Sequence, residues 1–183
     1  MTPQPNSVKS GAVQFDEMYN NLKNSQVTVR SVWIQITSPI NWSSSIRTNI
    51  DFINSILARA NTYGLTIGIY TNFYDWSQIT GYATASNVML WYWNVYGAGL
   101  SSESPANFDD FRPFAGWTVP NVKQFGQVES ICNIEVNRNI FSTTAASTTN
   151  PIRMENFNKS QQIIVGGLGL KNTAFTGKPE IKL

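Results

Sequence analysis

The chain has 183 residues and a formal net charge of +2, and 13% of its residues are charged, against a usual share of about 25%. Its Lys and Arg residues are scattered singly, so we expect no nucleic-acid partner. No stretch approaches the ~18 apolar residues of a membrane helix, and the first residues show no apolar signal-peptide region, so we expect no membrane partner.

Several chemistries are excluded by the residues that are missing. The sequence has no His and a single cysteine, Cys132. Histidine-based triads, an internal disulfide and zinc sites of the Cys₄ or Cys₂His₂ type are therefore ruled out. We expect no metal and no cofactor, and any acid or base catalysis must use carboxylates.

The first half of the chain predicts two helices around a strand. Apolar residues recur at helical spacing over 14–24, which predicts a short amphipathic helix. Residues 32–37 form a β-rich run that Pro39 ends, which predicts a strand. A longer helix is predicted to begin at Ile46 and to end near Gly64.

Short apolar runs continue the alternation of strands and helices. The sequence predicts strands at 65–70, 88–93, 122–125 and 134–141, helical turns at 73–79, and a loop or short helix at 105–111. Continuous apolar strands separated by helices predict an α/β fold with a parallel sheet that is covered on both sides.

The composition changes after Phe141. A low-complexity stretch of Ser, Thr and Ala follows, without sustained periodicity of either kind. We therefore predict one domain over 1–141 and a poorly ordered tail over 142–183, with 163–165 as its only strand-like run.

Six short motifs occur in a fixed order at or near the predicted strands. They are MetThrProGlnPro at 1–5, TrpIleGlnIleThr at 33–37, GlyIleTyrThrAsn at 68–72, LeuTrpTyrTrp at 90–93, LysGlnPhe at 123–125 and ValAsnArgAsnIlePhe at 136–141. In this order they resemble glycoside hydrolase family 25 lysozymes, particularly the nematode-type branch. No single motif is decisive, and the resemblance covers 1–141.

The resemblance implies a (β/α) barrel that hydrolyses the β-1,4 bond between N-acetylmuramic acid and N-acetylglucosamine in bacterial peptidoglycan. It implies a secreted protein that acts in antibacterial innate defence or in the digestion of bacteria. Because the motif at Met1 matches an inner strand of the family, we expect the chain to lack the family's first strands, including an aspartate on the first of them. A barrel without these strands has unpaired edges, which leaves open the hypothesis that the chain does not fold alone.

The positions at which the family carries carboxylates are changed in this sequence. Gln35 and Thr37 stand where the family has Asp-x-Glu, and Asn137 stands where it has an aspartate. An amide can hydrogen-bond a sugar but cannot transfer a proton at neutral pH. A catalytically degraded relative that only binds peptidoglycan or another N-acetyl sugar polymer is therefore an alternative to the lysozyme hypothesis.

Asp75 is the carboxylate best placed at a predicted strand end, and it is our candidate catalytic residue, with an N-cap or loop role as the alternative. Asp110 is predicted to cap or solvate a surface segment, and Glu129 to be a surface charge. The candidate substrate-binding residues are Gln35, Thr37, Tyr70, Asn72, Trp93, Gln124 and Asn137. For Tyr70 and Trp93 the alternative is core packing.

Overall fold

The computed structural model describes residues 1–141, 163–165, 175 and 177–183. Most of the predicted tail lies outside these residues, and the domain boundary after Phe141 stays a prediction. No helix among the described residues is long and apolar enough to cross a bilayer.

The described residues form three α-helices, in the order that the sequence predicts, and two short 3₁₀ helices that it does not predict. They are α1 (Gly11–Asn24), η1 (Pro39–Asn41), α2 (Ile46–Thr62), α3 (Phe73–Thr80) and η2 (Leu100–Ser102). Each α-helix begins at a polar cap: the side chains of Ser10, Ser45 and Asn72 accept hydrogen bonds from backbone N–H groups in the first turn. The segment 105–111 forms no helix, so of the two predicted forms it is a loop.

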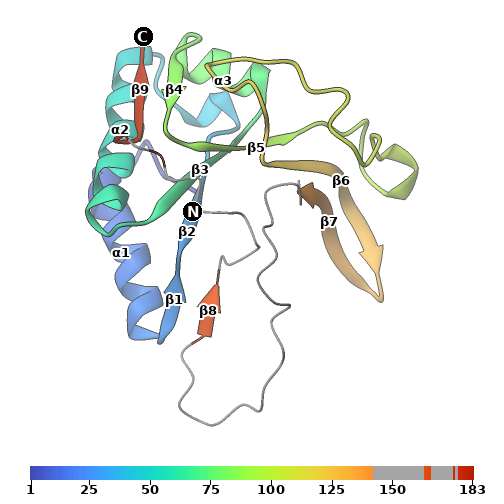
Figure 1. Ribbon diagram of the computed structural model, residues 1–183, viewed down its shortest axis with the longest axis horizontal. Coiled ribbons are helices and arrows are strands. Elements are labelled where there is room, and N and C mark those ends of the chain that lie inside the picture. The colour runs from blue at the N-terminus through green and yellow to red at the C-terminus, as the bar shows by residue number, and fades with distance from the viewer. Residues whose placement is uncertain (142–162, 166–174, 176) are drawn as a thin grey trace.

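The part of the chain that the structure describes contains nine strands in three sheets. They are β1 (Val27–Val29), β2 (Ser31–Gln35), β3 (Thr66–Thr71), β4 (Thr84–Ser86), β5 (Met89–Trp93), β6 (Val122–Ile131), β7 (Ile134–Phe141), β8 (Ile163–Val165) and β9 (Glu180–Lys182). The main sheet has the order β2-β3-β5-β6-β7, and its first four strands are parallel. In the described residues β2 and β7 are its edges, so the sheet is curled but does not close into a barrel (Figure 1).

The outer face of the sheet carries the hydrophobic core. Ile34, Ile69 and Leu90 lie on adjacent strands and are fully buried, together with apolar residues of α2 such as Ile53 and Leu57. In Figure 1, α1 and α2 lie near β2 and β3, and the β6–β7 hairpin forms the opposite edge of the sheet.

The inner face of the sheet, opposite the core, is partly open, whereas the sequence predicts a sheet that is covered on both sides. Burial alternates along β2 and β5, so that Trp33, Gln35, Trp91 and Trp93 are only partly buried. The apolar run at 88–93 therefore has an open face made of indole rings. Its sequence does not show this alternation, because tryptophan counts as apolar whichever face it occupies.

β6 is much longer than the predicted strand at 122–125. It continues to Ile131 and forms an antiparallel hairpin with β7, with register shifts on both sides of Gly126. A Cβ at Gly126 would lie 2.0 Å from Glu129 Oε1, so any larger residue there would displace that buried carboxyl.

The C-terminus belongs to the fold. β9 pairs antiparallel with β4, Ile181 is buried, and the side chain of Asn54 on α2 both donates to and accepts from the backbone of Ile181. The prediction that 163–165 is the only strand-like run after Phe141 is therefore wrong. Strand β9 is short, and its pairing partner lies about a hundred residues earlier, so no local sequence pattern predicts it.

Candidate functional site

The C-terminal ends of the parallel strands bring four of the candidate residues together. Gln35 pairs in register with Tyr70, and Trp93 pairs with Gln124. The Tyr70 hydroxyl donates a hydrogen bond of 2.9 Å to Gln124 Oε1. These side chains come from β2, β3, β5 and β6, and they form a polar and aromatic surface at one end of the sheet.

An inner-face pocket of about 320 Å³ lies on this surface. The residues that line it are Met1, Trp33, Gln35, Tyr70, Trp91, Gln124, Asn137 and Asn139. Trp33 and Trp91 meet edge to face with ring centroids 5.6 Å apart, and Trp91 Nε1 donates to Asn139 Oδ1. The pocket thus offers amides and indole rings, and no carboxylate lines it.

Gln35 also lines a smaller neighbouring pocket of about 220 Å³, together with Thr37 and Thr2. Gln35 Nε2 donates to the Thr37 hydroxyl at 3.0 Å, and Gln35 Oε1 accepts from the Thr2 hydroxyl at 2.8 Å. The two residues that replace the expected Asp-x-Glu pair therefore bond to one another. Neither can act as an acid at neutral pH.

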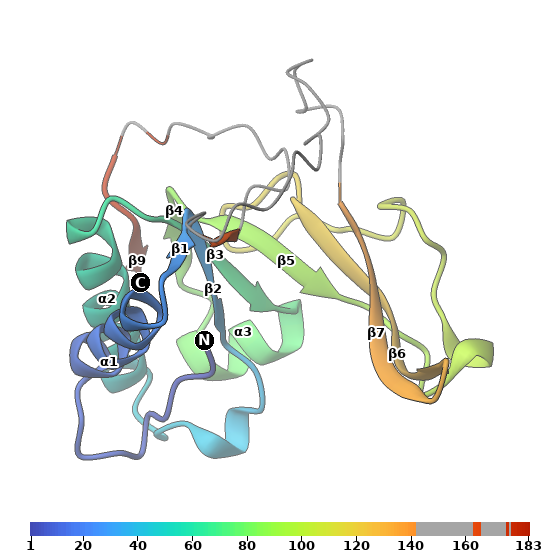
Figure 2. The same cartoon turned by 90° about the horizontal axis from the view of Figure 1, so that it is seen from below.

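A third cavity, the aromatic pocket, has about 490 Å³ and is lined by residues at the ends of β3 and β5 and at the start of α3. Figure 2 shows α3 next to the end of β3. The residues that line it are Asn72, Phe73, Tyr74, Tyr92, Trp93, Asn94, Asp110, Phe111, Arg112, Pro113 and Phe114. Six aromatic rings with a few amides and charges around them are typical of a site that binds the apolar face of a ligand and fixes its orientation with hydrogen bonds.

Asp75 lies in the first turn of α3, where its backbone N–H donates to the capping side chain of Asn72 at 2.7 Å. Asn72 is thus the N-cap, and the alternative of an N-cap or loop role for Asp75 is wrong. Its side chain is 6% exposed and lines none of the pockets described above. Burial raises the pKa of its carboxyl, although hydrogen bonds from the Ser38 backbone and the Trp93 side chain oppose the shift.

Tyr70 connects Asp75 to the inner-face pocket. Burial raises the pKa of Tyr70 to about 12, and the charge of Asp75 adds to the shift. Asp75 therefore raises the pKa of a residue of the inner-face pocket, Tyr70, and a residue of the aromatic pocket, Trp93, in turn lowers the pKa of Asp75. A carboxyl with a raised pKa next to such cavities matches the requirement for a general acid.

Asp110 is a site residue that the sequence does not identify. It lines the aromatic pocket rather than a solvated surface, and it accepts hydrogen bonds from the Tyr92 hydroxyl and the Asn94 amide. Lys123, which is fully buried, lies 2.9 Å from Asp110 Oδ2. Although burial opposes it, hydrogen bonding by Lys123, Tyr92 and Asn94 holds the pKa of Asp110 below its usual value. A lysine within the predicted apolar strand at 122–125 is the one signal that could have revealed this buried ion pair.

Glu129 is not the surface charge that the sequence predicts. It lies on β6 and is 3% exposed, and its Oε1 atom has no hydrogen-bond partner among the described residues. Burial raises the pKa of Glu129, and the neighbouring Glu103 raises it further, while Arg138 lowers it. Asn137 lies opposite this segment on β7, where its Oδ1 accepts from the Val128 N–H.

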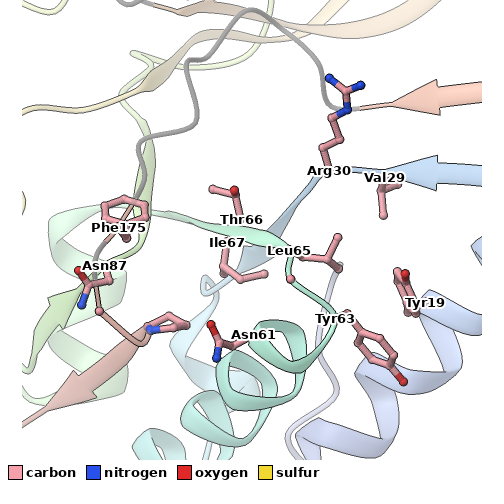
Figure 3. A pocket seen from close by; sticks show the side chains of 13 residues that line it. Tyr19, Val29, Arg30, Asn61, Tyr63, Leu65, Thr66, Ile67, Asn87 and Phe175 are labelled. Carbon is pink, nitrogen blue, oxygen red and sulfur yellow. The ribbon is translucent and has the colours of Figure 1, made fainter.

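Within the described part of the chain, no group of three or more Cys, Asp or Glu side chains is arranged to hold a metal ion. A further cavity of about 500 Å³ lies at the opposite end of the sheet, between the N-terminal ends of β2 and β3 and the C-terminal segment (Figure 3). Arg30, Asn87 and Phe175 are among the residues that line it. It is separate from the strand ends where α/β folds bind ligands.

Comparison with known proteins identifies the family. A family model described as Lysozyme-like protein 1 matches residues 1–125. The chain belongs to the lysozyme-like protein family. This confirms the resemblance that the six motifs indicate. No solved structure matches the chain.

The relatives of this lysozyme-like chain include proteins from two organisms. It is 50% identical over 176 residues to Lysozyme-like protein 1 of Caenorhabditis elegans, which covers 92% of this chain and 59% of that protein. It is 55% identical over 143 residues to Lysozyme-like protein 7 of the same organism, covering 77% and 50%. A more distant relative is Probable GH family 25 lysozyme 2 of Dictyostelium discoideum, 34% identical over 131 residues, covering 71% and 58%. The chain thus spans about half to three fifths of the length of these relatives.

Proposed function

We propose that this lysozyme-like domain acts on bacterial peptidoglycan. It hydrolyses the β-1,4 bond between N-acetylmuramic acid and N-acetylglucosamine at the C-terminal ends of its parallel strands. The proposal includes an extracellular location and a role in antibacterial defence or in the digestion of bacteria. We also infer that the open, curled sheet represents part of a family 25 barrel. Family membership supports each of these steps.

Binding is assigned to the inner-face pocket and the aromatic pocket. Gln35, Gln124 and Asn137 supply amides that hydrogen-bond hydroxyl and acetamido groups, and Trp93 supplies an indole face against which the C–H face of a pyranose packs. Asn72 contributes little to binding through its Oδ1 atom, because that atom caps α3. No Lys, Arg, Asp or Glu side chain of the described residues lines the inner-face pocket, so neutral side chains hold the sugar there.

We assign the general-acid role in this hydrolysis to Asp75. Glycosidases need a carboxylic acid that stays protonated until it donates to the leaving oxygen. Burial keeps the Asp75 carboxyl protonated to a higher pH than usual, and Asp75 lies in the first turn of α3, next to Phe73 and Tyr74, which line the aromatic pocket. Asp110 is unsuited to serve as the second carboxylate, because Lys123, Tyr92 and Asn94 already occupy its oxygens. We therefore assign the second role to the acetamido group of the substrate.

The second candidate function is binding without hydrolysis. The observation that favours it is the replacement of family carboxylates by Gln35, Thr37 and Asn137, which leaves the inner-face pocket without an acid. Loss of one general acid or base costs about 10²–10⁴-fold in rate. A protein in which Asp75 does not replace that function would bind peptidoglycan and release no products.

Release of reducing ends from insoluble peptidoglycan distinguishes the two functions. We expect release by the unaltered protein, a loss of about 10²-fold or more in Asp75→Asn, and normal release by Asp109→Asn. Asp109 is an exposed carboxylate next to the site that lines none of the described pockets, so it is a matched control. A folded protein that co-sediments with peptidoglycan but releases nothing would show the binding function instead.

A further inference from the structure

Three aromatic rings lie along one rim of the aromatic pocket. Phe73 is the first residue of α3 and is 55% exposed, and Tyr82 follows the end of α3 and is 66% exposed. The ring centroids of Phe73 and Tyr82 are 5.9 Å apart, and those of Phe73 and Phe114 are also 5.9 Å apart. We name Phe73, Tyr82 and Phe114 the aromatic platform.

The backbone holds Tyr82 in this position. Its φ is +65°, a left-handed conformation that is unfavourable for a bulky residue. Gly81 before it is also left-handed and ends α3 by donating to the Ser77 carbonyl. Ala83 after it is buried, and its carbonyl accepts from Trp76 Nε1 at 2.7 Å. The turn is therefore fixed at both ends and presents the Tyr82 ring to solvent. Backbone strain of this kind concentrates at functional sites.

The platform is continuous with the aromatic pocket. Phe73 and Phe114 belong to both, and Trp93 lies within the pocket. A ligand that leaves the pocket on this side moves directly onto exposed rings. Phe73 and Phe114 offer no hydrogen bond, and Tyr82 offers one hydroxyl, so the surface selects a ligand with flat apolar faces. The C–H faces of successive pyranose rings in a glycan have this property.

We propose that the aromatic platform is a second sugar subsite, which holds rings of a glycan chain beyond the unit that occupies the aromatic pocket. This subsite rests on the proposed function, because it requires that a glycan binds at the C-terminal ends of the parallel strands. Its consequence is a preference for polymeric peptidoglycan over short fragments. A cavity of about 490 Å³ holds one small ligand, so a disaccharide occupies the pocket without reaching Tyr82.

The test compares binding of the full chain to insoluble peptidoglycan with binding to the disaccharide of N-acetylglucosamine and N-acetylmuramic acid. The platform variants are Phe73→Ala and Tyr82→Asn. Asparagine tolerates the left-handed backbone better than tyrosine, so Tyr82→Asn removes the ring without weakening the fold. Tyr96→Ala is the matched control, because Tyr96 is 71% exposed and does not line the pocket. Trp93→Ala reports on the pocket itself.

We expect each platform variant to weaken binding to the polymer about three- to tenfold, the loss of about one aromatic contact. Binding to the disaccharide should not change in Tyr82→Asn, because Tyr82 does not line the pocket, whereas Phe73→Ala should also weaken it, because Phe73 does. Tyr96→Ala should behave as the unaltered protein. Normal polymer binding by both platform variants, together with weakened binding of both ligands by Trp93→Ala, would overturn the platform and leave the proposed function intact.

Two other results would also overturn the platform proposal. Failure of the unaltered protein to bind either ligand would remove both the proposed function and the subsite that rests on it. Sedimentation velocity that shows a dimer for the unaltered protein and a monomer for Tyr82→Asn would assign the exposed rings to self-association instead.

Discussion

Tryptophan has different roles in the core, which packs on the outer face of the main sheet, and on the open inner face. Three tryptophans, Trp42, Trp76 and Trp117, are buried in the core, and each donates its indole N–H to a backbone carbonyl. Three others, Trp33, Trp91 and Trp93, lie partly exposed on the inner face and line pockets. Large aromatic residues without full burial, placed beside amides, indicate a surface that binds a ligand rather than one that stabilises the fold.

The largest expected effect is the loss of stability caused by a substitution in the core on the outer face. Ile69 on the outer face is fully buried, so Ile69→Ala should lower the free energy of unfolding by about 2–5 kcal/mol. Chemical denaturation monitored by near-ultraviolet circular dichroism measures the loss. An unfolding midpoint equal to that of the unaltered protein would show that the outer face is not the core, and a protein without any cooperative transition would show that the chain does not fold alone.

A pH-dependent effect is expected where the β6–β7 hairpin buries Glu129. The pKa of Glu129 is raised in the folded protein, so the folded state binds its proton more tightly than the unfolded state. Its contribution is complete below the ordinary glutamate pKa, and stability is lost as the pH rises through the raised value. Glu129→Gln should flatten this dependence and raise the unfolding midpoint at neutral pH.

The control for Glu129 is Glu135→Gln on the same hairpin, because Glu135 is exposed. Glu103 and Arg138 are the charged groups that face Glu129, and both are present in either variant. Equal pH profiles for Glu129→Gln and the unaltered protein would show that Glu129 carries no proton in the folded state at neutral pH.

A smaller effect is expected on the inner face. Tyr70→Phe removes the hydrogen bond to Gln124 and keeps the ring, so it should cost about 1 kcal/mol or less of stability. It should also weaken sugar binding, because the Gln124 amide loses the bond that orients it. A stability loss as large as that of Ile69→Ala would place Tyr70 in the core, which is the alternative that the sequence leaves open.

The smallest effect is expected at an exposed ion pair on α2. Arg47 and Asp51 lie 3.0 Å apart at i, i+4 spacing, and both side chains are mostly exposed. Asp51→Asn should change the free energy of unfolding by about 0.5 kcal/mol or less, without effect on binding. A larger loss in thermal denaturation would mean that α2 depends on its surface charges rather than on its buried face.

Local pattern predicts much of the fold. Helical spacing places α1, α2 and α3, and short apolar runs place β2, β3, β5 and β7 and the start of β6. The strand ends then indicate where Gln35, Tyr70, Trp93 and Gln124 meet. Each of these inferences depends only on residues that are near in sequence.

The features that escape prediction depend on contacts across the chain. Asp110 becomes a site residue because buried Lys123 pairs with it, and Glu129 is buried because β6 continues beyond its apolar start. The sequence also does not reveal the open inner face, since an apolar run that includes tryptophans resembles a strand buried on both sides. Tertiary packing, rather than propensity, decides each of these cases.

The most direct test of the account uses the six indole N–H signals of ¹⁵N-labelled protein, one for each tryptophan. Soluble peptidoglycan fragments are added while the spectrum is recorded. We expect the signals of Trp33, Trp91 and Trp93 to shift with a common affinity and those of Trp42, Trp76 and Trp117 to stay in place. Unchanged signals for all six, or shifts confined to the three core tryptophans, would contradict the assignment of the inner face as the surface that binds sugar.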